Sequence, residues 1–282
     1  MSRQLPVKSK SGLVVLGGTA ASNPGVVWLV GAGPGDPELL TLKALRILGT
    51  ADVVVHDGLV SDDILDLAPP KARRLSVAKR KSRHSYAQDE INKMLVAFAR
   101  DGLTVVRLKG GDPFMFGRGG EELEACRAAG VACEVVPGVT AALAASASAG
   151  APLTHRGMAQ AVTFVTGHAA EGDEPDLDWA SLARANQTVV IYMGLSMAQV
   201  IAERLLAAGR AASTPALIVV NASRADEHRV ITTLANLAEA AQSLSGPALL
   251  MVGEAMSLAT SQSRPLNATD DHALLLRTGG QF

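Results

Sequence analysis

The chain has 282 residues, of which 26 are Lys or Arg and 27 are Asp or Glu, so its formal net charge is −1. This balance and an aromatic content of 3% argue against a nucleic-acid-binding protein, which needs a basic excess and aromatic rings for base stacking. The length is sufficient for two α/β domains with separate cores, or for one large domain.

The sequence predicts a cytoplasmic protein without a metal site. Its two cysteines, Cys126 and Cys133, form no C-x-x-C pair and lie near no His-rich tract, so we expect neither a bound metal nor a disulfide framework. The apolar run at 13–16 is too short for a signal peptide, and no stretch approaches the roughly 18 apolar residues of a membrane span. Residues 1–24 and 264–282 are expected to be flexible tails.

The first predicted βα unit begins with an apolar strand at 26–30, which ends in the glycine-rich turn 31–37. Asp36 is expected to cap a helix whose first residue is Pro37. The apolar stripe of that helix is predicted to consist of Leu39, Leu42, Leu45 and Leu48.

The same alternation of strands and helices continues along the chain, which predicts an α/β fold with mainly parallel sheets. Capping boxes are predicted at Ser85–Gln88 and at Ser196–Gln199, and further helices at 121–129 and 139–148. The pattern restarts after Pro152, so we predict an N-terminal α/β domain at 25–151 and a C-terminal α/β domain at 152–263. The remaining strands are predicted at 53–56, 103–108, 131–136, 162–166, 188–193, 216–220, 229–233 and 248–252.

The first glycine turn allows two interpretations. It follows a strand and opens a helix, and Asp57 stands about 20 residues beyond it, where a dinucleotide-binding fold places its ribose carboxylate. However, Asp36 occupies the position of the third glycine, and a carboxylate there repels a pyrophosphate. A nicotinamide-dependent oxidoreductase and a purely structural corner therefore both remain possible.

A second glycine turn at 109–120 gives a more specific indication of a ligand site. Gly110 and Gly111 allow a ligand to approach the backbone closely, and Asp112 can accept a hydrogen bond from a ribose hydroxyl or an amine. Arg118 sits among glycines, which do not favour a regular helix on which an i,i+4 acidic partner would face it. We therefore expect Arg118 to bind an anionic ligand rather than to form a surface salt bridge.

Basic side chains recur at and after the ends of the predicted strands. In an α/β sheet these ends border the ligand crevice, so a polyanionic substrate would meet several cations there. Met193, just before a glycine at a strand end, is a candidate for ligand contact. The basic residues are Lys79, Arg80, Lys81, Arg83, Lys109, Arg118 and Arg156.

An ordered series of motifs between about residues 25 and 253 resembles the uroporphyrinogen-III C-methyltransferases of the tetrapyrrole methylase family. The resemblance implies the tetrapyrrole methylase fold, with two α/β domains, S-adenosylmethionine in the cleft between them, and a homodimer. The motifs are GAGPGDP at 31–37, VVVHDGLV at 53–60, AKR at 78–80, RLKGGDPFMFGRGGEE at 107–122, VVPGVTAAL at 135–143, PLTHR at 152–156, VTGH at 165–168 and YMGL at 192–195.

The resemblance also implies roles for individual residues. Asp57 matches the catalytic base, Lys79 the proton donor, and Arg118 a further catalytic position. Glu121 and Arg156 match substrate-binding positions. The S-adenosylmethionine site is implied to consist of Pro34, Gly110, Gly111, Asp112, Met115, Thr140, Ala141, Met193, Ala222 and Ala248.

The implied reaction is methylation of uroporphyrinogen III at C2 and C7, which gives precorrin-2 through precorrin-1 and releases S-adenosylhomocysteine. The substrate is a tetrapyrrole polycarboxylate with electron-rich pyrrole carbons, so neither a covalent nucleophile nor a metal is needed. We expect a methylase without dehydrogenase or ferrochelatase segments, whose product serves sirohaem, cobalamin or haem d1 synthesis. The alternatives are a later precorrin C-methyltransferase, an NAD-dependent oxidoreductase and a catalytically silent ligand sensor.

Overall fold

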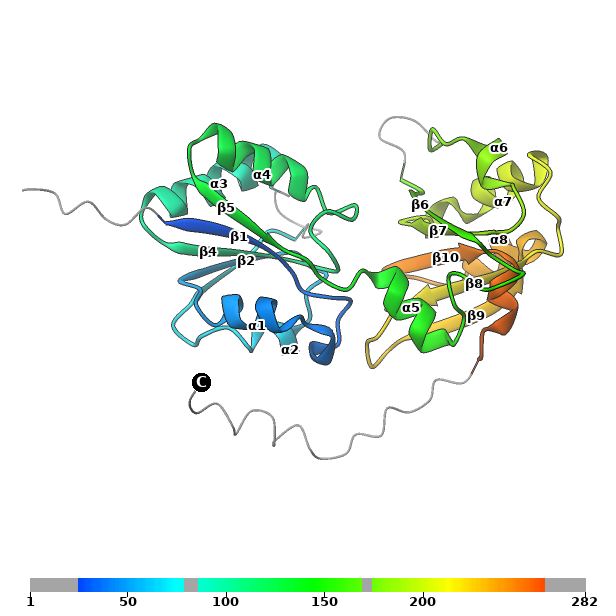
Figure 1. Ribbon diagram of the computed structural model, residues 1–282, viewed down its shortest axis with the longest axis horizontal. Coiled ribbons are helices and arrows are strands. Elements are labelled where there is room, and N and C mark those ends of the chain that lie inside the picture. The colour runs from blue at the N-terminus through cyan, green and yellow to red at the C-terminus, as the bar shows by residue number, and fades with distance from the viewer. Residues whose placement is uncertain (1–24, 79–85, 169–173, 262–282) are drawn as a thin grey trace, which may run out of the picture.

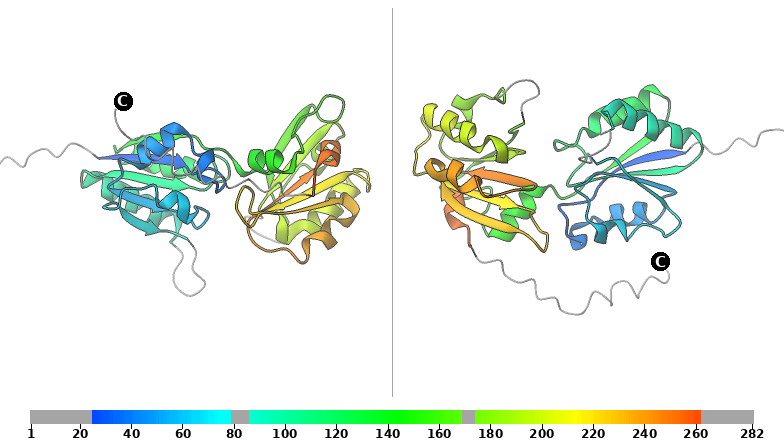
Figure 2. Two further views of the ribbon diagram at one scale, coloured as in Figure 1. Left: turned by 90° about the horizontal axis from the view of Figure 1, so that it is seen from below. Right: turned by 180° about the vertical axis from the view of Figure 1, so that it is seen from behind.

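The computed structural model describes residues 25–78, 86–168 and 174–261, which form two five-stranded sheets (Figure 1). Each sheet has helices on both faces, and the two layered units lie side by side (Figure 2). This arrangement confirms the predicted α/β fold class. Within the described part of the chain, no helix has the length and apolar character needed to cross a membrane.

The first sheet is entirely parallel, with the strand order β3-β2-β4-β1-β5. Helices α1 and α2 cover one face and α3 and α4 the other (Figure 1). Because strands such as β1 are buried on both sides, they form the continuous apolar runs that the sequence shows. The bounds are β1 Val26–Gly31, α1 Leu42–Leu48, β2 Val53–His56, α2 Asp62–Leu65, β3 Arg73–Ser76, α3 Gln88–Arg100, β4 Thr104–Lys109, α4 Gly119–Ala128 and β5 Ala132–Val136.

The two glycine turns lie next to each other because β1 and β4 are neighbours in this sheet. Gly33 and Gly111 exchange backbone hydrogen bonds of 3.1 and 2.7 Å. The loop after β5 also approaches closely: a Cβ atom on Gly138 would lie 2.2 Å from the carbonyl oxygen of Gly111. Three loops at the carboxyl edge of the sheet thus approach one another closely at glycines.

The second sheet has the order β6-β7-β10-β8-β9 and is mixed. Only β6 and β7 are parallel, whereas β10 runs antiparallel to both β7 and β8, and β8 antiparallel to β9. The mainly parallel character predicted from the sequence therefore applies to the first sheet and not to the second. The bounds are β6 Ala161–Thr166, α6 Trp179–Leu182, β7 Gln187–Tyr192, η2 Leu195–Met197, α7 Ala198–Ala207, β8 Pro215–Val220, β9 His228–Thr233, η3 Leu234–Asn236, α8 Leu237–Ala241, β10 Ala248–Val252 and η4 Glu254–Leu258.

Helix α5, Ala141–Ala149, packs against the second sheet although it precedes the predicted domain boundary (Figure 1). Its buried alanines Ala142, Ala145 and Ala149 share one core with β7, β8 and β10. Small side chains let the helix lie close to the strands. The boundary between residues 151 and 152 stays a prediction.

The helix predicted after the first glycine turn is divided in two. Asp36 caps a short 3-10 helix at Pro37–Leu39, through a hydrogen bond of 2.8 Å from the N–H of Glu38, and Thr41 then caps α1. Since α1 starts anew, its buried face contains Ala44, Ile47 and Leu48. Leu42 and Leu45, predicted to be part of the apolar stripe, are exposed.

The predicted capping boxes are not seen. Ser85 lies outside the described residues, and α3 instead has the Glu90 carboxylate accepting from the N–H of Ala87 at 2.8 Å. Helix α7 has Met197 as its N-cap and no side-chain cap, so the box at Ser196–Gln199 was wrong. Strand β3 was not predicted because its sequence, RRLS, is mostly polar and exposed at the sheet edge.

Candidate functional site

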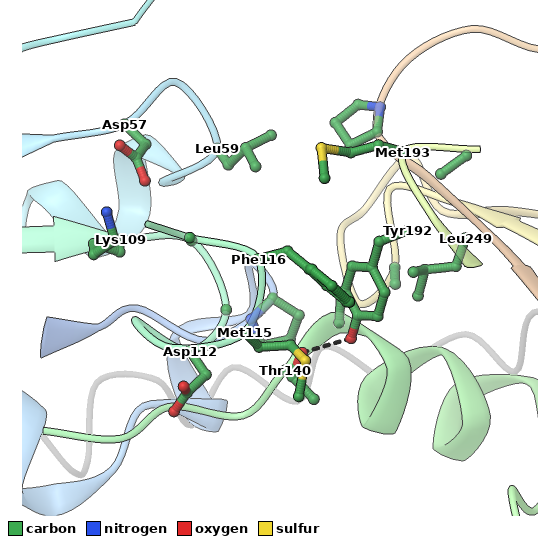
Figure 3. A pocket seen from close by; sticks show the side chains of 18 of the residues that line it. Asp57, Leu59, Lys109, Asp112, Met115, Phe116, Thr140, Tyr192, Met193 and Leu249 are labelled. Atoms are coloured by element: carbon green, nitrogen blue, oxygen red, sulfur yellow. Dashed lines mark hydrogen bonds between the residues drawn. The ribbon is translucent and has the colours of Figure 1, made fainter. Parts of the chain in front are cut away.

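A cavity of about 720 Å³ lies between the two sheets (Figure 3). The first half of the chain contributes the loops after β1, β2 and β4 and the start of α5, and the second half contributes the ends of β7 and β8. Because β10 runs antiparallel to β7 and β8, its first residues lie at the same edge as their ends. The antiparallel strand thereby brings 246–249 into the cavity wall.

Most of the site residues predicted from the sequence line this cavity. Asp57 and Arg118 line the cavity, whereas Lys79 lies outside the described residues. Glu121 and Arg156 are described but are not part of the cavity wall. Every residue assigned to the methyl donor lines the cavity, namely Pro34, Gly110, Gly111, Asp112, Met115, Thr140, Ala141, Met193, Ala222 and Ala248.

Arg118 forms the surface salt bridge that the sequence analysis excluded. Its Nε and Nη2 donate to the two carboxylate oxygens of Glu121, each at 2.7 Å. This hydrogen bonding raises the pKa of Arg118 and lowers the pKa of Glu121. The prediction was wrong because it considered only i,i+4 pairs: Arg118, with φ 59°, directly precedes α4 and pairs with Glu121 at i,i+3.

The carboxylate of Asp112 holds the loops of the site in place. Its Oδ1 accepts from the N–H of Phe114 at 2.9 Å, and its Oδ2 accepts from the N–H of Gly138 at 3.0 Å. In Figure 3 the carboxylate points away from Phe116 and Tyr192. Asp112 therefore fastens the loop after β4 to the loop after β5, a role that the sequence analysis did not assign to it.

Tyr192, at the end of β7, connects the two halves of the site and was not predicted (Figure 3). Its hydroxyl accepts from the N–H of Ala142 at 3.2 Å, which leaves its proton free to donate to Thr140 Oγ1 at 2.6 Å. Its ring lies 5.0 Å from that of Phe116, measured between centroids. Burial raises the pKa of Tyr192, so the hydroxyl keeps its proton at neutral pH.

We expect Tyr192→Phe to lower the free energy of unfolding by about 1–2 kcal/mol, because Thr140 and the N–H of Ala142 lose a buried partner. Urea denaturation followed by circular dichroism measures the change. Tyr86→Phe is the matched control, since Tyr86 is exposed and its change should stay within about 0.5 kcal/mol. Equal effects of the two substitutions would contradict a stabilising role for the hydrogen bonds of Tyr192.

Strained backbone is concentrated at the cavity. Of the six non-glycine residues with positive φ in the described part of the chain, four line it: Phe116, Arg118, Met193 and Asn221, with φ between 52° and 59°. Each such conformation costs on the order of 1 kcal/mol or more, and such residues cluster at functional sites. The strain supports the cavity as the functional site without reference to any motif.

Three charged side chains next to Asp57 are almost completely buried: Arg107 and Lys109 from β4 and Glu122 from α4. Arg107 Nε donates to Glu122 Oε1 at 2.8 Å, and its Nη2 donates to Asp57 Oδ1 at 2.5 Å. The Nζ of Lys109 lies 3.1 Å from both oxygens of Glu122. Lys109, expected to meet a polyanionic substrate, lines the cavity but is only 1% exposed and is paired with Glu122.

Arg224 and Ser223, in the loop after β8, link the second half of the chain to the first. The Nη2 of Arg224 donates to the carbonyl oxygen of Leu59 at 2.5 Å, and the N–H of Asp36 donates to Ser223 Oγ at 3.3 Å. Arg224 also lines the cavity. Neither residue carries a sequence signal that would have identified this contact.

The other residues missed by the sequence analysis do carry signals. Arg107 and Glu122 stand inside the segment 107–122, and a charged residue such as Arg107 in an otherwise apolar strand indicates a buried, paired charge. Tyr192 stands in the YMGL motif, and a strand-end Tyr commonly finds a hydrogen-bond partner when buried.

Residues 26–238 match the family model of the tetrapyrrole (corrin/porphyrin) methylases. Siroheme synthase 1 of Serratia proteamaculans is 55% identical over 234 residues, which cover 83% of this chain and 49% of that protein. Siroheme synthase of Psychromonas ingrahamii is 54% identical over 235 residues, which cover 83% of this chain and 50% of that protein. The chain spans about half the length of the curated relatives it matches.

Two solved structures share the fold. Uroporphyrin-III C-methyl transferase from Thermus thermophilus, complexed with S-adenyl homocysteine, is 45% identical with a TM-score of 0.73 and covers 83% of this chain and 100% of its own. A cobalt precorrin-4 methyltransferase is 31% identical with a TM-score of 0.73, over 82% of this chain and 95% of its own. Together with the family match over most of the chain, these similarities show that it belongs to the tetrapyrrole methylases.

Proposed function

We propose that this chain is an S-adenosylmethionine-dependent C-methyltransferase that converts uroporphyrinogen III to precorrin-2 by methylation at C2 and C7, through precorrin-1. The observation that carries the proposal is the cavity between the sheets, which is lined by every residue assigned to the donor together with Asp57 and Arg118. Identity is higher with the Thermus thermophilus enzyme, at 45%, than with the cobalt precorrin-4 methyltransferase, at 31%. This difference favours uroporphyrinogen III over a later precorrin.

The cavity wall fits S-adenosylmethionine. At Gly110 a Cβ atom would lie 2.7 Å from the Cβ of Leu59, so the loop passes there without a side chain. Met193 and Phe116 are 51% and 39% exposed and offer apolar surface to a flat base or a sulfonium group. When bound, the donor supplies an electrophilic methyl group to an electron-rich pyrrole carbon, and S-adenosylhomocysteine remains.

The protein side chains have to orient the substrate, move protons and exclude water. We assign proton uptake from the methylated substrate to Asp57 and proton supply to Lys79. Arg118 and Arg156 are assigned to the substrate carboxylates, which an arginine binds through two parallel hydrogen bonds. Glu121 holds Arg118 until a substrate carboxylate takes its place.

Arg118→Ala should lower kcat/KM for uroporphyrinogen III about 10- to 100-fold, because a charge-assisted hydrogen bond to a carboxylate contributes roughly 1.5–3 kcal/mol. The Kd for S-adenosylhomocysteine should stay within about threefold of wild type. The exposed pair with Glu121 contributes little to stability, so the free energy of unfolding should change by less than about 1 kcal/mol. Arg127→Ala, at an exposed position of α4, is the control. Wild-type kcat/KM in Arg118→Ala would contradict the assignment.

The reaction is tested by incubating the protein with S-adenosylmethionine and uroporphyrinogen III and measuring the molecular mass of the product by mass spectrometry. A gain of two methyl groups supports the proposal, and methylation of a later precorrin alone would overturn it. Calorimetric titration with S-adenosylhomocysteine and with NADH separates the methylase from an oxidoreductase. Binding without turnover of any tetrapyrrole would indicate a ligand sensor.

We also propose that the protein acts as a homodimer in the cytoplasm, with domains at 25–151 and 152–263. Light scattering coupled to size-exclusion chromatography tests the dimer. Limited proteolysis with mass mapping of the fragments tests the domain boundary.

A further inference from the structure

The charged side chains around Asp57 form a closed set, which we call the buried cluster: Asp57, Arg107, Lys109 and Glu122. Glu122 is central, because it accepts from both Arg107 and Lys109, and Arg107 also donates to Asp57. Gln88 of α3 adds a hydrogen bond of 3.4 Å from its side-chain nitrogen to Glu122 Oε1. Figure 3 shows Asp57 and Lys109 at the same end of the cavity.

The cluster contains two cations and two anions, so its charge is balanced. The side chains of Arg107, Lys109 and Glu122 are at most 3% exposed, whereas that of Asp57 is 27% exposed. Arg107 and Lys109 line the cavity together with Asp57, but Asp57 is the most accessible member of the cluster. Buried charges are costly unless they are paired, so these groups are stable only as a set. Asp57 is therefore the member positioned to exchange a proton with a molecule in the cavity.

Asp57 lies among charges of both signs, since Arg107 bonds it directly and Glu122 and Lys109 belong to the same cluster. A nearby cation favours the charged form of a carboxylate, and a nearby anion opposes it. Burial lowers the pKa of Lys109, and the charge of Arg107 lowers it further, while Glu122 raises it. Glu122 thus favours the charged form of Lys109, and it places a negative charge beside the two cations of the cluster.

We propose that Glu122 and Lys109 are positioning residues for proton transfer: Glu122 holds Arg107 against Asp57, and the opposite charges of Glu122 and Lys109 set the proton affinity of Asp57. The inference rests on the proposed function, in which Asp57 takes the proton that leaves the methylated substrate.

Other titratable and charged groups lie near the cluster and stay constant in the test. His56 bonds the carbonyl oxygen of Asp57 through Nδ1 at 3.0 Å, Tyr86 and Arg118 line the same cavity, and Cys126 lies one turn after Glu122 in α4. Because none of them is changed, their contributions cancel when variants are compared with wild type.

The test compares the pH profiles of kcat for Glu122→Gln and Lys109→Met with uroporphyrinogen III. Glu122→Gln leaves Asp57 in a more positive surrounding, so the acid limb should move to lower pH by about one unit. Lys109→Met removes a cation, so the acid limb should move to higher pH by a similar amount. We expect kcat at the optimum to fall about tenfold in both variants, with the Kd for S-adenosylhomocysteine within about threefold of wild type.

Charge-conserving variants separate this role from simple packing. Glu122→Asp and Lys109→Arg should restore the position of the acid limb even where kcat stays reduced. Glu124→Gln, with the same charge change at an exposed position of α4, is the control and should leave the profile unchanged. If Glu122→Gln fails to fold, the Lys109 pair still tests the predicted direction.

Shifts of both variants in the same direction, or no shift in either, would overturn this inference while leaving the proposed methyltransferase intact. An Asp57→Asn variant with wild-type turnover would instead overturn the assignment of Asp57, and the inference with it. If the wild-type protein itself turns over no tetrapyrrole, the proposed function is wrong.

Discussion

Asp57→Asn is expected to lower kcat about 10²- to 10⁴-fold, because an amide cannot take up the proton that a carboxylate accepts, and general acid–base catalysis contributes about that much. Asn has the size of Asp and retains a carbonyl oxygen, so the hydrogen bond from Arg107 Nη2 can persist and the loop after β2 should keep its shape. Single-turnover measurements with S-adenosylmethionine and uroporphyrinogen III give the rate of the chemical step directly.

Two controls test whether the effect is specific to Asp57. One is the affinity for the methyl donor, and the other is the same substitution at a second aspartate. Asp57 is not among the residues assigned to the donor, so the Kd for S-adenosylhomocysteine should stay within about threefold. Asp63→Asn, at an exposed position of α2 that does not line the cavity, makes the same chemical change and should leave kcat unchanged. Turnover of Asp57→Asn within threefold of wild type would contradict the role of Asp57 as proton acceptor.

The parallel first sheet could be predicted because its strands are short, apolar and separated by helices of the 3.6-residue period. Hydrophobic periodicity does not encode strand direction, and an apolar strand buried on both faces looks the same in either orientation. For this reason β10 was recognised as a strand and its antiparallel direction was not. Edge strand β3 was missed because its exposed arginines give no apolar pattern.

The position of the site was predictable from loops at strand ends, since both glycine turns follow strands that are neighbours in the sheet. The ion-pair partners of individual charged side chains were harder to predict. Arg118 pairs with Glu121 at i,i+3, a spacing that the sequence analysis did not consider, and its left-handed conformation before α4 is not visible in the sequence. Lys109 pairs with Glu122 because α4 folds back onto β4, a contact that depends on tertiary structure.

A second large effect is expected for stability: Arg107→Met should lower the free energy of unfolding by about 3–5 kcal/mol, because it leaves two carboxylates near a single buried ammonium group. The chain has two tryptophans. In a Trp179→Phe background, Trp28 of β1, which lies opposite Val106 of β4, reports on the first sheet alone during urea denaturation. Arg74→Met is the matched control.

The control separates a buried charge from an exposed one. Arg74 forms a pair of 2.8 Å with Asp66, but the two side chains are 36% and 74% exposed, so its loss should cost less than about 1 kcal/mol. A loss for Arg107→Met no larger than that of Arg74→Met would show that the buried cluster does not stabilise the first sheet.

A double-mutant cycle then distinguishes balanced charge from ordinary packing. Arg107→Met leaves Asp57, Glu122 and Lys109 with one negative charge in excess, and the additional change Glu122→Gln restores neutrality with Asp57 and Lys109. If charge balance governs the cluster, the double variant should be more stable than the sum of the two single losses predicts, by about 1–3 kcal/mol. If packing governs it, the two losses should add, because the glutamine fills the volume of Glu122 and the cavity left by Arg107 is unchanged. A loss in the double variant that is smaller than the sum of the two single losses would therefore show that Arg107 and Glu122 stabilise the first sheet as a charge pair.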